Sequence, residues 1–348
     1  MDRRSFSMAI AIGMSALAIA YVAAKVDWGL LRDSANRFHL GYIPLLIAVY
    51  MLGHILRGVR WMWMLQPVKK IPVSTTTGVV LIGYMANNLL PFRLGELVRA
   101  FLMGRISSVK NMTLLSSIGA ERVMDGLTLL VCLSFSLSFA PGQQASASRI
   151  SEAATLATLL FICVASTILL MRVWPQAFRR IVKVGAGRLP NALSEKVMSV
   201  VESILESLEF VRFDWRFARI LCMSLAVWLT EAAMFYLGLF AFDFPASIEL
   251  ALFTLAVVNL GVLIPSAPGY IGIFQLGTVA AFSVFGLSTE NATAYSVVIH
   301  LCQYLPVTLT GLFLLTRFGY SFQDLANRQP KTSASSKLEV THLVEVVK

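Results

Sequence analysis

Apolar runs of about bilayer-spanning length recur along the chain and constrain its fold more than any other feature. A helix needs about 20 mainly apolar residues to cross the hydrocarbon core of a membrane. Hydrophobic residues make up 57% of the 348 residues and charged residues only 14%, whereas soluble domains hold about 25% charged residues. We therefore predict an all-α, polytopic membrane protein. The six runs interpreted as full spans are 6–24, 41–65, 112–139, 153–173, 216–241 and 290–316.

Two further apolar stretches are interrupted by proline. Residues 73–104 contain Pro91, and residues 249–283 contain Pro265 and Pro268. Each stretch is too long for one helix and too short for two full spans with a loop, and proline disrupts a helix. Non-helical backbone at membrane depth is tolerated only where protein covers it or where it lines a wet cavity. We therefore predict two broken, re-entrant helical hairpins, with two full-span helices in each stretch as an open alternative.

The distribution of lysine and arginine predicts the orientation. If both broken stretches return to their own side of the membrane, one side receives most of the basic residues. The segments on that side are 66–72, 105–111, 174–215 and 317–348. The positive-inside rule assigns such a side to the cytoplasm, together with both termini. The net charge of +10 then reflects membrane orientation, and we expect no nucleic-acid partner.

The same elements occur twice in the same order. Residues 1–140 hold two spans, the broken hairpin 73–104 and a third span, and residues 150–320 repeat that order with the broken hairpin 249–283. The first half begins inside and the second begins outside, so we predict inverted repeats. Broken segments at matching places of inverted repeats indicate a transporter binding site.

The two interruptions also resemble each other locally. In each one, a proline is followed four residues later by a glycine and is preceded by an asparagine. The matched residues are Asn88, Pro91 and Gly95 in the first half and Asn259, Pro265 and Gly269 in the second. Together with Pro268 and Gly272, these prolines and glycines are the predicted hinge residues.

Two segments are expected to lie in the cytoplasm outside the repeats. In the insert 174–215, apolar residues recur at steps of three and four from Leu193 to Val211, which indicates an amphipathic helix. It either lies on the inner leaflet beside anionic lipid or docks a partner. The segment 321–348 is polar and is predicted to be a disordered tail.

Charged residues follow the first interruption closely. A helix that begins after Pro91 would carry Arg93, Glu96 and Arg99 at steps of three, on one broad face. The first N–H groups of a helix are unpaired and attract phosphate. The stretch that also includes Asn88 is therefore a candidate substrate-binding segment.

A second charged group lies in the next span, at Glu121, Arg122 and Asp125. Ionisable groups inside a membrane are costly and indicate a functional site by default. We predict that Arg93 and Arg99 bind a lipid phosphate while Glu121 and Asp125 orient them. A closed ion-pair network without a ligand is the alternative.

The second interruption carries neutral polar groups. Asn259, Tyr270 and Gln275 lie in or beside it, and they are predicted to hold the glycerol or sugar part of a head group. A purely structural re-entrant loop is the alternative interpretation.

Three charged residues lie in other spans. Glu231 is near the middle of its span and is interpreted as a proton carrier or as a partner for an arginine. Arg57 and Arg60 are near a span end, where long basic side chains snorkel to the membrane surface. We therefore expect these two arginines to lie outside the site.

No pattern of metal, cofactor or catalytic chemistry is present in the sequence. The four cysteines lie singly in apolar segments, and the sequence lacks a P-loop, a GxSxG motif and an HExxH motif. We expect no metal, no cofactor, no catalytic residue and no enzymatic activity.

Three motifs in order, NNLLPFRLGELVRAFLMGR, ERVMDGLTLL and PSAPGYIGIFQ, resemble the flippase-like membrane family typified by the transmembrane region of lysylphosphatidylglycerol synthases. The resemblance covers about residues 5–316. It implies lipid handling, because in larger relatives this region is implicated in moving aminoacylated phosphatidylglycerol between leaflets. Those relatives carry a fused aminoacyl-transferase domain, which is not expected here. Stand-alone members are implicated with isoprenoid-linked sugars or hopanoids.

These observations predict flippase-like translocation of an anionic phospholipid or a lipid-linked head group across a bacterial inner membrane. Without an ATP motif, transport would be passive or coupled to an ion gradient. The alternatives are a membrane-embedded lipid-modifying enzyme with Glu121 or Asp125 as base, and an accessory subunit of an envelope-lipid pathway. Expected partners are anionic or isoprenoid-linked lipids, and a homo-oligomer or a lipid-synthesis partner stays open.

Overall fold

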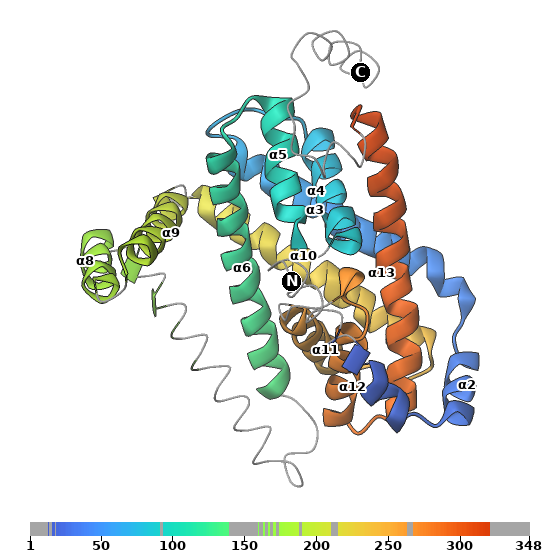
Figure 1. The fold of residues 1–348 in the computed structure, drawn as a ribbon. Helices are drawn as coiled ribbons and strands as arrows, with labels where there is room; N and C mark the ends of the chain where they lie inside the picture. Colours follow the sequence, from blue (N-terminus) through green and yellow to red (C-terminus); the bar gives the residue numbers. More distant parts are fainter. Residues whose placement is uncertain are drawn as a thin grey trace.

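A computed structural model describes residues 19–90, 93–138, 174–187, 190–209, 215–262 and 267–320, with isolated residues at 13, 16–17 and between 159 and 171. Within these ranges the chain is helical and contains no strand (Figure 1). Most of the predicted spans 6–24 and 153–173, and the tail 321–348, lie outside the described residues. The all-α fold predicted from the apolar runs is confirmed.

Four described helices match predicted full spans, at Ile43–Leu65, Asn111–Ser138, Trp215–Ala241 and Thr289–Arg317. The first half contains α2 (Trp28–Asn36), η1 (Leu40–Tyr42), α3 (Ile43–Leu65), α4 (Val73–Leu89), α5 (Gly95–Ser107) and α6 (Asn111–Ser138). The second contains α8 (Pro175–Ala186), α9 (Asn191–Glu209), α10 (Trp215–Ala241), α11 (Ile248–Gly261), η3 (Pro268–Tyr270), α12 (Ile273–Val284) and α13 (Thr289–Arg317).

Several described helices are suited to a membrane. Three are long and apolar enough to cross one, at Leu40–Leu65, Ala218–Ala241 and Thr289–Arg317. The outer side of α13 exposes a row of apolar side chains at steps of three and four: Leu301, Leu305, Leu309, Leu312 and Phe313. In a membrane such a row faces lipid rather than water, so the chain is a multi-pass membrane protein.

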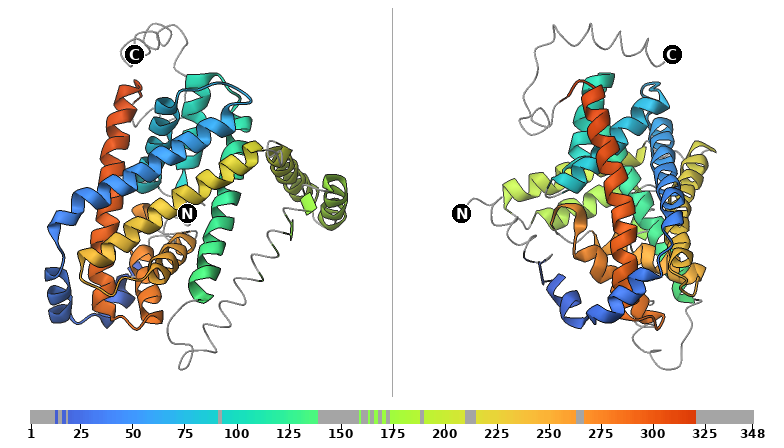
Figure 2. Two further views of the ribbon diagram at one scale, coloured as in Figure 1. Left: turned by 180° about the vertical axis from the view of Figure 1, so that it is seen from behind. Right: turned by 90° about the vertical axis from the view of Figure 1, so that its right-hand side faces the viewer.

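The helix contacts of the two halves match. Helix α3 packs along α10, α4 packs on α13 as α11 packs on α6, and α2 packs on α13 as α9 packs on α6. Helices α6 and α13 run in opposite directions, and the hairpins α4–α5 and α11–α12 lie at opposite ends of the molecule (Figures 1 and 2). If α2–α6 are exchanged with α9–α13, the same pairs of helices remain in contact. A pseudo-two-fold axis between the halves produces this symmetry.

The backbone at the two breaks corrects the match made from sequence. Arg93 (φ 53°) and Tyr270 (φ 60°) both adopt the left-handed conformation, which is uncommon for residues with a side chain. Each lies two residues after a proline and two residues before a glycine that opens the next helix. Pro91 therefore corresponds to Pro268, not to Pro265, and Gly95 corresponds to Gly272.

Glycine is required at both helix starts, for different reasons. A side chain at Gly95 would collide with the carbonyl oxygen of Gly83 and the amide of Asn87, so α4 and α5 approach too closely for any other residue. Gly272 has a φ of 89°, a conformation that side chains disfavour. Each hairpin thus turns back on itself within the molecule.

The insert contains the expected helix as α9, and a second helix, α8, precedes it. Helices α8 and α9 pack on each other and extend away from the repeats, with α9 against α6 (Figure 1). Arg179 on α8 pairs with Glu202 on α9 at 2.9 Å. The insert therefore contacts the repeats at α6, the helix that carries Glu121 and Asp125.

Candidate functional site

A cavity of about 410 Å³ lies where the two broken hairpins meet. Helix α4 contacts η3, and the Arg93 guanidinium carbon lies 5.7 Å from the centre of the Tyr270 ring. Both halves line the cavity, through α3, α4, α5 and α6 on one side and α10, α11, η3, α12 and α13 on the other. Non-helical backbone from both breaks therefore borders one internal space, as expected for backbone at membrane depth.

A buried ion-pair network lies behind one wall of the cavity, centred on Glu121. Arg99 donates to both carboxylate oxygens of Glu121, at 3.0 and 3.1 Å. Arg122 donates to Oε1 at 2.6 Å, and Arg60 lies 3.2 Å from the same oxygen. Glu121 is fully buried, so one carboxylate holds three arginines in place.

Asp125 extends this network to the cavity. It accepts hydrogen bonds from Arg60 at 2.6 Å and from the Trp228 indole at 3.0 Å, and it lies 3.2 Å from Arg122. Because Trp228 belongs to α10, Asp125 connects the network of the first half to the second half. The described contacts of Asp125 are thus all with protein donors.

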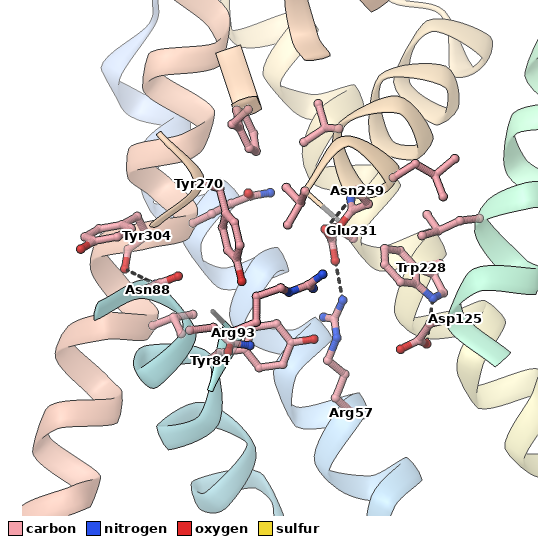
Figure 3. A pocket seen from close by; sticks show the side chains of 18 of the residues that line it. Arg57, Tyr84, Asn88, Arg93, Asp125, Trp228, Glu231, Asn259, Tyr270 and Tyr304 are labelled. Atoms are coloured by element: carbon pink, nitrogen blue, oxygen red, sulfur yellow. Dashed lines mark hydrogen bonds and ion pairs between the residues drawn. The ribbon is translucent and has the colours of Figure 1, made fainter. Parts of the chain in front are cut away.

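A separate ion pair joins Arg57 of α3 to Glu231 of α10 (Figure 3). Glu231 also accepts from the Asn259 amide of α11, at 3.3 Å. The Arg57 guanidinium carbon lies 5.4 Å from the Tyr84 ring centre and 5.5 Å from that of Trp228. Arg57 lines the cavity, and its Nε and Nη1 have no hydrogen-bond partner in the described part of the chain.

The expectation that Arg57 and Arg60 snorkel is wrong. Arg57 is 2% exposed and Arg60 is fully buried, because both are paired with carboxylates. Those carboxylates come from α6 and α10, far away in the sequence. Position along the span alone therefore cannot distinguish a snorkelling arginine from a buried one.

Seven of the ten predicted substrate-binding residues line the cavity: Asn88, Arg93, Glu96, Arg122, Asp125, Asn259 and Tyr270. Arg99 and Glu121 lie behind them in the network, and Arg99 stacks over Trp61 at 4.4 Å. Gln275 accepts from the Gly272 N–H at 2.7 Å and bonds to His300 at 3.2 Å, so it fixes the start of α12.

The predicted hinge residues have different environments. Gly95 opens α5 and donates its N–H to the side chain of Asn87 at 2.7 Å. Pro268, Gly269 and Gly272 form the described part of the second break. Pro91 and Pro265 lie outside the described residues.

The opposite wall is built from neutral aromatic and amide groups that the sequence analysis missed. His300, Gln303 and Tyr304 of α13 line the cavity, and the His300 ring stacks on Phe274 with 4.5 Å between ring centres. Asn88 donates to Thr308 on the same helix at 2.9 Å. The spacing of His300 and Gln303, three residues apart in an apolar span, is the signal that could have identified this wall.

Nine charged side chains are buried or line the cavity within the described residues, and we call them the charge cluster. They are five arginines and four carboxylates: Arg57, Arg60, Arg93, Arg99, Arg122, Glu96, Glu121, Asp125 and Glu231. With the histidines counted as neutral, the cluster carries one net positive charge. Each break also contains a few residues outside the described ranges, 91–92 in the first and 263–266 in the second. Their sequence includes no ionisable side chain.

Comparison with known proteins places the chain among membrane proteins. The family model described as "Lysylphosphatidylglycerol synthase TM region" matches residues 8–311. A "UPF0104 membrane protein" of Methanothermobacter thermautotrophicus is 24% identical over 338 residues, which cover 91% of this chain and 97% of that protein. "Glycosyltransferase AglD" of Haloferax volcanii is 26% identical over 272 residues, or 70% of this chain.

The similarity to Glycosyltransferase AglD corrects one expectation. The sequence analysis expects no enzymatic activity, and the similarity to a protein named for a glycosyltransferase contradicts that expectation. The match spans 43% of the length of that relative.

The family assignment itself rests on the match over residues 8–311, which extends from the first predicted span to the last. That range contains both broken hairpins and every residue of the charge cluster. The chain therefore belongs to the family defined by the transmembrane region of lysylphosphatidylglycerol synthases.

Proposed function

We propose that the protein moves a lipid with an anionic head group between the two leaflets of a bacterial inner membrane. The cavity would hold the head group while the acyl or isoprenyl chains stay in the bilayer. The observation that carries this proposal is Arg57, a buried arginine on the cavity wall whose Nε and Nη1 lack partners among the described residues.

A phosphate is the ligand that best suits these donors. Figure 3 shows Arg57 and Arg93 pointing into the same part of the cavity, with Tyr84 and Tyr270 beside them. A head group that enters the membrane loses its water, and guanidinium groups replace those hydrogen bonds in a fixed geometry. An unmet buried donor is costly, and an anion oxygen would make a stronger hydrogen bond to Arg57 than a neutral acceptor would.

The arrangement of the hairpins supports movement rather than binding alone. The two hairpins approach the cavity from opposite ends of the molecule (Figure 1). In inverted-repeat transporters, movement of one repeat against the other opens the same central site to each side in turn. Opening of the α4–α5 break or of the α11–α12 break would therefore expose the head group to opposite faces of the membrane.

The experiment that tests this function measures the movement of a fluorescent phosphatidylglycerol across liposomes that contain the purified protein. Arg93→Lys keeps the charge but loses the planar fork, so it should reduce transfer about tenfold without a lower melting temperature. Arg179→Lys on α8 is the matched control, because Arg179 pairs with Glu202 outside the cavity. Full transfer by Arg93→Lys, or equal loss in both variants, would refute the proposal that Arg93 binds the phosphate.

The proposed orientation places both termini and residues 174–215 in the cytoplasm, as the distribution of lysine and arginine predicts. Single cysteines at positions 176–187 should then react with a membrane-impermeant reagent only in inverted vesicles. Labelling from the periplasmic side of intact cells would contradict this orientation.

A second candidate function is the transfer of a sugar to or from a membrane lipid. The similarity to a relative named Glycosyltransferase AglD favours it. Incubation of the purified protein with labelled sugar donors and a lipid extract, followed by chromatography of the lipids, distinguishes the candidates. A labelled lipid product supports transfer chemistry, whereas movement of intact lipid without a product supports translocation.

A further inference from the structure

We propose that the cavity selects lipids whose head group carries a single net negative charge, and that Glu231 sets this preference. The inference deepens the proposed function and rests on it, because it presumes that a head group enters the cavity. It extends that function by naming the substrate class: a phosphodiester with an uncharged, hydroxyl-bearing remainder.

The charge cluster contains one more arginine than carboxylates. Its five arginines and four carboxylates leave one positive charge without a countercharge among the described residues. A net charge inside a membrane protein is expensive, and it becomes favourable only when it is paired. A ligand with one negative charge would make the occupied site neutral.

Other head groups leave the site charged. A zwitterionic phosphodiester would leave the net charge at +1, and an aminoacylated one with two ammonium groups would raise it to +2. A phosphomonoester with two negative charges would reverse it to −1. The ranking therefore follows from charge count alone, and it disfavours the cationic head groups of aminoacylated lipids.

The second half of the cavity fits the uncharged remainder of such a lipid. Tyr270, His300, Gln303 and Tyr304 line it, and no carboxylate of the described residues lies on α12 or α13 beside the cavity. Amide, phenol and imidazole groups exchange hydrogen bonds with hydroxyls. An ammonium group beside α12 and α13 would find no counterion on these two helices.

Substitution of Glu231 should change the charge preference of the cavity. The ionic partner of Glu231 in the described structure is Arg57, whereas Glu121 holds three arginines. Glutamine has the same shape, and its oxygen can still accept from Arg57, while the Asn259 amide loses its bond to residue 231 and keeps its bond to the Leu255 carbonyl at 2.9 Å. Glu231→Gln therefore raises the net charge of the cluster to +2 with little change in packing.

The test compares short-chain lipids that bind the purified protein in detergent at about pH 8.5. Dihexanoyl phosphatidylglycerol carries one negative charge there, and dihexanoyl phosphatidic acid carries two because its second pKa is about 6. Dihexanoyl phosphatidylcholine is the zwitterionic probe. We expect the wild-type protein to bind phosphatidylglycerol about tenfold more tightly than the other two, and Glu231→Gln to prefer phosphatidic acid about tenfold.

Glu202→Gln is the matched control, since it removes a carboxylate of α9 that pairs with Arg179 outside the cavity. It should keep the wild-type order of the three lipids. Glu96→Gln makes the same charge change from another wall of the cavity and replaces Glu231→Gln if that variant fails to fold.

The outcomes separate this inference from the proposed function. If the wild-type protein binds none of the three lipids, the proposed function fails. If it binds phosphatidic acid or phosphatidylcholine as tightly as phosphatidylglycerol, selection by charge is wrong while head-group binding stands. A folded Glu231→Gln protein that still prefers phosphatidylglycerol also overturns the inference.

Discussion

The two halves of the protein have the same helix contacts but line their shared cavity with different chemistry. In the first half, the break and the two following helices carry Arg93, Glu96 and Asp125. In the second half, the corresponding elements carry Tyr270 and His300. The two halves can thus share their helix contacts while the polar side chains at the cavity differ. The difference gives the cavity one end suited to an anion and one suited to hydroxyl groups.

The largest expected difference between the halves is in stability. Glu121→Gln removes the carboxylate that holds Arg60, Arg99 and Arg122, and a buried ion pair broken on one side costs about 3–5 kcal/mol. In the second half, Gln303 donates only a weak bond to the sulfur of Met234 at 3.7 Å.

Gln303→Leu should therefore cost less than about 1 kcal/mol. Denaturation in detergent measures the free energy of unfolding of each variant. If both variants unfold alike, the first half does not hold the structural ion-pair network that we describe.

The two breaks also show which parts of the fold can be predicted from the sequence alone. The helices and their interruptions were predictable, because a run of about 20 apolar residues and a proline within it each have a direct physical consequence. The sequence alone could not show which proline of the second break corresponds to Pro91, because Pro265 and Pro268 are each followed by a glycine four residues later. Only the left-handed backbone of Arg93 and Tyr270 decides between them.

The site was predictable to a similar extent. Arg93 and Glu96 drew notice because charge beside a proline in an apolar stretch is unusual. The partners of Arg57 could not be found in this way, because Glu231 lies on a helix of the other half. Gln275 caps a helix rather than lining the cavity, and only the folded position of α12 shows the difference.

The next largest effect concerns the glycines that open the two returning helices. Gly95→Ala should cost about 1–3 kcal/mol, because the added methyl meets the Gly83 carbonyl and the Asn87 side chain. Gly272→Ala should cost about 1–2 kcal/mol through its φ of 89°.

Melting temperatures in detergent compare the two variants with Gly286→Ala. Gly286 also has a positive φ, of 75°, but a side chain there has open space. A Gly95→Ala protein as stable as the wild type would show that α4 and α5 do not approach as closely as described.

An exchange of residues between the breaks tests whether the chemical difference matters for transport. In the double variant Arg93→Tyr with Tyr270→Arg, both side chains keep a place at the cavity but the arginine moves to the second half. Glu96 stays behind in the first half. We expect liposome transfer of phosphatidylglycerol to fall about tenfold, since a displaced guanidinium loses its geometry with respect to Arg57. Retained transfer would mean that either break can hold the phosphate.

The smallest predicted effect concerns the hydroxyls of the head group. Tyr304 lines the cavity in the second half, and Tyr84 lines it in the first half beside Arg57. If the second half binds the uncharged remainder of the lipid, Tyr304→Phe should weaken binding of dihexanoyl phosphatidylglycerol by about twofold to tenfold, the value of one hydrogen bond. Dihexanoyl phosphatidylmethanol has the same charge and no hydroxyl, so its affinity should not change. Tyr84→Phe should affect the two lipids equally, because Tyr84 lies at the phosphate end. A loss in Tyr304→Phe that is the same for both lipids would place the hydroxyls elsewhere and remove the chemical distinction between the two walls.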